Sequence, residues 1–181
     1  TPPVPFNLMF QTKIGAEQKE IINENKDTST GFLRPETAQG IFVNFNRLLE
    51  QNGGRTPFAC SQIGTGFRNE ISPRNGLLRV REFPMAEIEH FVNPKDKSHK
   101  KFGDVKDIVL PLFDRVSQTT DGKVKQVSVG EAVEKGIISC ESLGYFIART
   151  YLFLELVGIK LSHVRFRQHL KSEMAHYASD C

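Results

Sequence analysis

Long apolar runs are absent from this 181-residue sequence, so no stretch has the length and hydropathy of a membrane span. The first residues, TPPVP, also lack the basic flank and the apolar segment of a signal peptide. These two absences predict a cytoplasmic protein without membrane attachment, although a mitochondrial form stays open.

Cysteine is scarce, and the thiols at Cys60, Cys140 and Cys181 are odd in number and far apart. This spacing argues against a disulfide framework and against a CxxC-type metal site. The motifs GxxxxGKS/T, GxGxxG, HExxH and GxSxG are also missing. A bound nucleotide is therefore expected to be held by side chains on a sheet, and no metal ligands can be identified.

Charge of one sign is not in large excess, since 24 Lys+Arg stand against 21 Asp+Glu. A net charge of +3 does not by itself indicate a nucleic-acid-binding protein. The 39% of hydrophobic residues suffices for one globular domain. Because the chain lacks an initiating Met and stops directly after a structured stretch, we expect an internal piece of a larger protein; a small processed protein is the alternative.

The most informative stretch is CSQIGTGFRNEISPRNGLLRVREFPMAEIEHFV, residues 60–92. Its alternation predicts two strands joined by a polar turn at 72–76, with the odd positions of the first strand facing the core. The opposite face of that strand carries Gly64, Gly66, Arg68 and Glu70. One side of the second strand carries Arg79, Arg81, Phe83, Met85, Glu87 and Glu89. Because two glycines leave open space beside an arginine, this surface is predicted to bind a phosphorylated, ring-containing ligand.

Residues 31–54 have the pattern of a single helix. Pro35 suits its first turn, apolar residues recur every three or four positions, and the glycines after Asn52 end it. From this pattern alone, Glu36 complements the helix dipole and Arg34 is a solvated flank.

The rest of the chain alternates short elements. Residues 6–14 and 164–168 are strand-like, residues 15–30 form a surface loop, and the lysine-rich residues 93–107 form a solvated connector. Ser128 is predicted to be the N-cap of a short helix, and a longer helix is predicted over 139–157 that ends at Gly158.

The order of the motifs LRPETAQG and FRNEISPRNGLLRVREFPMAEIEHF resembles class II aminoacyl-tRNA synthetases, and among them the glycyl-tRNA synthetases of the eukaryotic type. The resemblance extends to LGYFIART, RFRQH and EMAHY and so covers nearly the whole chain. It implies an α+β fold, in which the class II antiparallel sheet is flanked by helices and carries an inserted subregion. Residues 1–92 would form part of the catalytic core with motif 2, residues 93–163 the insertion, and residues 164–181 a return to the core.

The resemblance also implies an enzyme that activates glycine with ATP and transfers it to tRNA(Gly), with Mg²⁺ accompanying the ATP. Arg68 would be the catalytic residue, at the α-phosphate. The ATP-binding set carried over from the family is Arg68, Asn69, Glu70, Arg79, Val80 and Phe83. Glu36 and Glu87 would hold the glycine ammonium, which replaces the dipole interpretation of Glu36, and Glu89 would support them.

The resemblance leaves parts of the family outside this chain. Motif 1, motif 3 and the anticodon-binding domain are missing, so the chain alone is expected to be inactive, whereas a full-length parent would be a homodimer. Lys97, Lys100 and Lys101 are expected to contact the tRNA acceptor end, and Arg74 a phosphate or the tRNA end. The alternatives are a non-catalytic synthetase-like protein that binds ATP or RNA, and a plain nucleic-acid-binding module.

Overall fold

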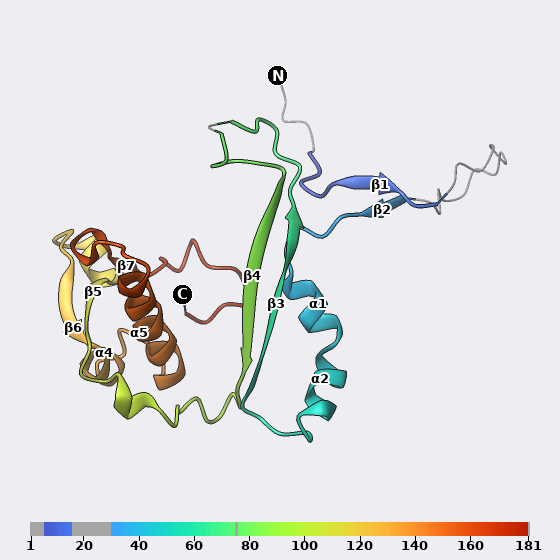
Figure 1. Ribbon diagram of the computed structural model, residues 1–181. Helices are drawn as coiled ribbons and strands as arrows, with labels where there is room; N and C mark the ends of the chain where they lie inside the picture. Colours follow the sequence, from blue (N-terminus) through green and yellow to red (C-terminus); the bar gives the residue numbers. More distant parts are fainter. Residues whose placement is uncertain (1–5, 16–29, 75, 181) are drawn as a thin grey trace. The chain divides into compact units, whose positions relative to one another are not determined.

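A computed structural model describes residues 6–15, 30–74 and 76–180 of the chain (Figure 1). Its internal contacts divide the chain into two compact units, residues 1–93 and residues 94–181. The division falls one residue after the predicted end of the core segment at position 92. The strand in residues 164–181 pairs within the second unit. The assignment of these residues to the catalytic core stays a prediction.

The first unit begins with a short antiparallel pair. Strand β1, Gln11–Lys13, pairs with β2, Thr30–Phe32. The strand predicted over 6–14 is therefore confined to three residues. Most of the loop predicted at 15–30 lies outside the described residues.

The predicted pair of long strands is present. Strand β3, Phe58–Phe67, runs antiparallel to β4, Glu82–Phe91, in continuous register from Phe58 opposite Phe91 to Phe67 opposite Glu82. The prediction of which face is buried was wrong, because Ile63 is 80% exposed whereas Gly66 is buried. The residues at even positions of β3 are covered instead, by the chain that follows β2.

The predicted single helix is two helices. Helix α1, Ala38–Val43, and α2, Phe45–Gln51, meet at Asn44, whose side-chain Nδ2 donates to the Gly40 carbonyl at 2.8 Å. The predicted end is confirmed, since Gly53 and Gly54 both adopt positive φ angles. Pro35 and Glu36 precede α1 rather than lying in its first turn.

Aromatic rings hold these helices against β3 and β4, which run alongside them in Figure 1. The ring of Phe91 lies 4.9 Å from Phe45 of α2 and 4.9 Å from Phe58 of β3, and Phe42 of α1 meets it edge-on. Burial of these rings supplies apolar area on one side of the strand pair and fixes where the N-terminus of α1 lies on it.

The second unit is a small mixed sheet covered by helices. Strand β5, Val109–Phe113, pairs antiparallel with β6, Lys125–Ser128, and parallel with β7, Phe166–Arg167. The helices are α3, Arg115–Thr119, α4, Val129–Glu134, and α5, Glu141–Leu156, with single 3₁₀ turns η1, Phe102–Asp104, and η2, Leu161–His163. The core cluster comprises Val105, Leu110, Leu112, Val129, Ala132, Ile138 and Ala148.

The helix predictions in this unit are confirmed. Ser128 accepts from the backbone N–H of Glu131 at 3.3 Å at the start of α4, and α5 ends just before Gly158, whose φ is positive. No helix among the described residues is long and apolar enough to cross a membrane.

Candidate active site on the β3–β4 face

One face of the strand pair carries part of the predicted ligand-binding set. The register sets Gln62 opposite Glu87, Gly64 opposite Met85 and Gly66 opposite Phe83, so the even residues of β3 and the odd residues of β4 share a face. This sharing confirms the prediction from alternation. The segment 34–38 lies on the same face, since the N–H of Phe67 donates to the Arg34 carbonyl at 2.9 Å.

The two glycines of β3 do not leave open space, contrary to the sequence prediction. A Cβ at Gly64 would collide with the Arg34 guanidinium, and one at Gly66 would lie 2.7 Å from Met85 Sδ and 3.2 Å from the Pro35 carbonyl oxygen. Glycine in a strand often marks close approach of another backbone. Here the glycines admit the segment 34–38, which brings Glu36 to this face.

Glu87 fastens that segment to β4. Its Oε2 accepts three hydrogen bonds, from Thr37 N, Thr37 Oγ1 and Ala38 N, each at 2.6 Å. The carboxylate thus satisfies backbone N–H groups at the N-terminus of α1, a role that a local capping side chain usually fills. The hydrogen bond from the Thr37 hydroxyl outweighs partial burial and lowers the pKa of Glu87, aided by the Ala38 and Thr37 N–H groups and the Arg68 charge.

A second carboxylate on this face behaves in the opposite way. Burial raises the pKa of Glu89, and the negative charges of Glu87 and Glu36 raise it further. The charges of Glu36 and Glu87 therefore give the region around Glu89 a negative potential. Such a region attracts a cation, and an ammonium group is the cation that the resemblance implies.

Arg68 lies immediately beyond β3, where its backbone N–H donates to the Arg81 carbonyl at 2.9 Å. Its Nε donates to the Pro35 carbonyl at 3.3 Å, and its guanidinium carbon lies 5.3 Å from the centre of the Phe83 ring. These contacts hold the planar group from one side. Within the described part of the chain, its two Nη nitrogens make no hydrogen bond, and the side chain is exposed.

The remaining predicted ATP residues are not gathered around Arg68 by side-chain contacts. Asn69 is fastened to the N-terminal segment, because its N–H donates to the Leu8 carbonyl at 2.8 Å and its Nδ2 to the Asn7 carbonyl at 3.1 Å. Glu70 contributes its carbonyl, which accepts from Nε and Nη2 of Arg81 at 3.2 and 3.0 Å. Arg81 therefore pairs with the backbone.

The turn between the strands carries the other predicted residues. Arg79 forms an isolated antiparallel bridge with Arg74, so both lie at the hairpin end beyond the paired part of β4. Val80 is half-buried between this bridge and β4. The structure thus places these three residues along the hairpin, and the roles of Arg79 and Val80 toward ATP and of Arg74 toward a phosphate or the tRNA end stay predictions.

Sequence reasoning missed the three polar residues that organise this face. Arg34 Nε donates to the Thr65 carbonyl at 3.0 Å, so Arg34 is not a solvated flank. The Gln62 amide, with its oxygen toward Arg34, accepts from Arg34 Nη1 at 3.0 Å and donates to the Thr37 carbonyl at 2.9 Å. The side chain of Thr37 is fully buried. The spaced glycines of β3 were the signal of a close approach.

Comparison with known proteins agrees with this geometry. Residues 20–177 match the family model described as the tRNA synthetase class II core domain (G, H, P, S and T), so the chain belongs to this family. Its α+β architecture is consistent with that membership.

Within the family, the chain is similar to glycine–tRNA ligases. It is 56% identical to the glycine–tRNA ligase of Caenorhabditis elegans over 181 residues, which cover 100% of this chain and 23% of the relative. It is 57% identical to the mitochondrial glycine–tRNA ligase 1 of Saccharomyces cerevisiae over 182 residues, covering 99% and 25%. The yeast glycine–tRNA ligase 2 is 56% identical over 179 residues, covering 97% and 27%. The chain thus spans about a quarter of the length of these relatives.

Proposed function

We propose that this chain forms part of the catalytic domain of a glycine–tRNA ligase, which activates glycine with ATP and transfers the glycyl group to tRNA(Gly). The observation that carries the proposal is the β3–β4 face, where an exposed guanidinium beside an aromatic ring lies on the same face as a group of carboxylates. The similarity to glycine–tRNA ligases over the whole chain supports it. We further propose that the full-length parent protein is a homodimer and acts in the cytoplasm, with a mitochondrial form left open.

Arg68 supplies the electrostatic part of the activation step. The glycine carboxylate oxygen attacks the α-phosphorus of ATP, the bond from this phosphorus to the bridging oxygen breaks, and pyrophosphate leaves. Negative charge builds on the non-bridging oxygens, and the Nη nitrogens of Arg68 donate to them. Because Pro35 and Phe83 already hold the guanidinium, little reorganisation is needed when that charge develops.

Phe83 supplies an apolar surface for the adenine ring. The Arg68 guanidinium lies over its ring, so adenine stacks on the opposite side. In class II synthetases ATP is used together with Mg²⁺, which neutralises phosphate charge. Among the described residues, no group of three or more His, Cys, Asp or Glu side chains could hold a metal ion.

The carboxylates provide the counter-charge for the glycine ammonium. The lowered pKa of Glu87 keeps it ionised at neutral pH, and its three hydrogen bonds all go to Oε2, which leaves Oε1 as the oxygen for the ammonium. Glu36 lies one residue before Thr37, in the segment that Glu87 holds. A bound ammonium relieves the repulsion among Glu36, Glu87 and Glu89. The negative charges that repel one another in the empty site therefore favour binding of the cation.

The lysine-rich segment is proposed to contact the tRNA acceptor end. It is not a loose connector, because the carbonyls of Lys97 and Ser98 accept from N and Oγ of Ser142 at 3.1 and 3.2 Å. The N–H of His99 also donates to Glu141 Oε2 at 2.9 Å. The backbone that carries the exposed side chains of Lys97, Lys100 and Lys101 is thereby fixed to the start of α5. Fixed cations suit phosphate contacts.

The proposed function is tested by amino-acid-dependent exchange of pyrophosphate into ATP in the full-length parent polypeptide. Glycine should support exchange, whereas alanine and serine, each with a substituent on Cα, should not. Charge reversal at Lys97, Lys100 and Lys101 should raise the KM for tRNA in aminoacylation and leave glycine-dependent exchange unchanged. Binding of ATP with no exchange for any amino acid would instead indicate a non-catalytic synthetase-like protein.

A further inference from the structure

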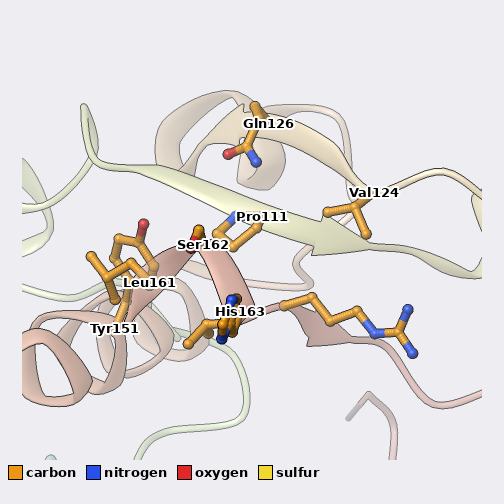
Figure 2. Close-up of a pocket in the computed structure, with 9 residues that line it drawn as sticks. Pro111, Val124, Gln126, Tyr151, Leu161, Ser162 and His163 are labelled. Atoms are coloured by element: carbon orange, nitrogen blue, oxygen red, sulfur yellow. The ribbon is translucent and has the colours of Figure 1, made fainter. Parts of the chain in front are cut away.

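A cavity in the second unit is lined by none of the residues assigned above. It has a volume of about 550 Å³ and lies between strands β5 and β6, helix α5 and the turn η2 (Figure 2). Nine residues line it, namely Pro111, Val124, Gln126, Tyr151, Leu161, Ser162, His163, Val164 and Arg165. This volume falls in the range of ordinary small-ligand sites, about 300–1,000 Å³.

The cavity follows from a break in the pairing of β5. Pro111 has no N–H to donate, and the parallel ladder with β7 begins only at the next residue, where Leu112 lies opposite Phe166. The chain before β7 is instead held in a tight turn, since His163 N donates to the Lys160 carbonyl at 2.9 Å and Val164 N to the Leu161 carbonyl at 3.0 Å. The wall of the cavity is thus fixed by backbone hydrogen bonds.

The ionisable groups in the lining favour an anion. Arg165 carries a permanent positive charge, His163 offers a ring N–H, and no Asp or Glu is among the nine lining residues. The guanidinium carbon of Arg165 lies 5.0 Å from the centre of the Phe113 ring. This contact orients the cation before any ligand binds, which lowers the entropic cost of binding an anion.

The rest of the lining suits a flat ring with polar edges. Tyr151 is held by the ring of Phe166, with centroids 6.1 Å apart and an interplanar angle of 60°. Figure 2 shows Tyr151 and Leu161 on one side of Pro111 and Val124 on the other, with Gln126 and Ser162 contributing amide and hydroxyl groups. Apolar walls with a few polar groups are the usual surroundings of a nucleobase or similar ring.

We infer that this cavity binds a nucleoside phosphate unit, with the phosphate at Arg165 and His163 and the base against Tyr151 and the apolar wall. The unit is either a free nucleotide or one nucleotide of a single-stranded RNA, since both present the same chemistry. The inference does not depend on the proposed function, because none of the lining residues belongs to the β3–β4 face.

The test is a titration of the ¹⁵N-labelled 181-residue chain with AMP, with CMP, with a short unstructured oligoribonucleotide and with inorganic phosphate. We expect the amide resonances of residues 161–165 and Tyr151 to shift with AMP or CMP, and to shift more weakly with phosphate alone. Tighter binding of the oligoribonucleotide would identify RNA as the source, and equal or tighter binding of AMP or CMP would identify a free nucleotide. Phosphate binding as tight as nucleotide binding, or no shift with any nucleotide, would overturn the inference.

A matched pair of variants separates a site from general charge attraction. Arg165→Gln removes the cation of the lining, and Lys160→Gln removes an exposed cation just before η2 that does not line the cavity. We expect Arg165→Gln to weaken nucleotide binding at least about ten-fold, as loss of a hydrogen bond to a charged group does, and Lys160→Gln to leave it unchanged. Spectra of the unliganded variants confirm that each is folded. Equal effects of the two substitutions would contradict a specific site.

Discussion

Glu87→Gln tests how the β3–β4 face is assembled. In the wild-type chain one carboxylate oxygen accepts three hydrogen bonds from Thr37 and Ala38, each at 2.6 Å. Hydrogen bonds to a charged group contribute about 1.5–3 kcal/mol and neutral ones about 0.5–1.5 kcal/mol, so removing the charge costs about 1 kcal/mol per bond. Because the site is half-exposed, we expect a total loss of about 2 kcal/mol in the local stability of α1.

Hydrogen exchange of the 181-residue chain measures this loss directly. The amides of Thr37, Ala38 and Gly40 report on opening at the start of α1, and about 2 kcal/mol corresponds to roughly thirty-fold less protection. Protection in the second unit should not change, because its residues belong to a separate set of contacts. Unchanged protection at the start of α1 would show that these hydrogen bonds do not hold the segment.

Glu89→Gln is the matched control on the same face of β4. Burial and the charges of Glu87 and Glu36 raise the pKa of Glu89, so its ionised form is disfavoured in the folded chain. Removing its charge should therefore leave the protection of α1 unchanged or raise it slightly. If Glu89→Gln loosened α1 as much as Glu87→Gln, the difference between the two carboxylates would be refuted.

The lowered pKa of Glu87 predicts how exchange protection at the start of α1 depends on pH. The pKa of Glu87 is lower in the folded chain than its ordinary value of 4.5, so its contribution is fully present above that value. The contribution is lost as the pH falls through the lowered pKa, because the protonated carboxyl is a weaker acceptor. Protection factors of wild type should fall in this acidic window, whereas those of Glu87→Gln should lack this component.

Three further predictions concern packing, capping and activity. Gly66→Ala places a Cβ 3.2 Å from the Pro35 carbonyl oxygen and 2.7 Å from Met85 Sδ, and should cost about 1–3 kcal/mol, measured as lost exchange protection in β3. Ser128→Ala removes the side-chain cap on Glu131 N and should cost about 1 kcal/mol in thermal unfolding of the second unit. Because the chain spans about a quarter of the length of its relatives, we expect the isolated 181-residue chain to show no glycine-dependent pyrophosphate exchange; exchange at the rate of a full-length parent would contradict this.

Local patterns predicted the elements whose determinants are local. The alternation of β3 and β4, the Ser128 cap and the end of α5 before Gly158 each depend on residues within a few positions of one another. Because successive side chains of a strand point to opposite sides, alternation alone predicted that Phe83 and Glu87 share a face. It also predicted that Arg68 lies beside them, and the Arg68 guanidinium does lie over the Phe83 ring.

The covered face could not be predicted because its determinants are distant in sequence. The N-terminus of α1 is set by Glu87, which is 50 positions from Thr37, so no local capping signal marks it. Arg34 lies 31 positions from its acceptor, the Thr65 carbonyl. The exposed Ile63 was assigned to the core because apolar character was taken as burial, whereas the close approach admitted by Gly64 and Gly66 decides which face is covered.

The cavity beside Pro111 left no sequence signal either. Its lining combines a strand, a helix and a 3₁₀ turn, and each of its residues has an ordinary structural interpretation when taken alone. Pro111 does not interrupt β5, which continues through it. The proline instead marks the position at which pairing with β7 has not begun.

The central claim is that Arg68 on the β3–β4 face stabilises charge at the α-phosphate of ATP. Glycine-dependent pyrophosphate exchange in the full-length parent tests it with Arg68→Ala and with Arg55→Ala, a control at an exposed arginine of the same unit. Loss of one preorganised donor should lower the rate of Arg68→Ala by about a hundred- to thousand-fold, while Arg55→Ala keeps the wild-type rate. A folded Arg68→Ala enzyme that exchanges at the wild-type rate would contradict the account.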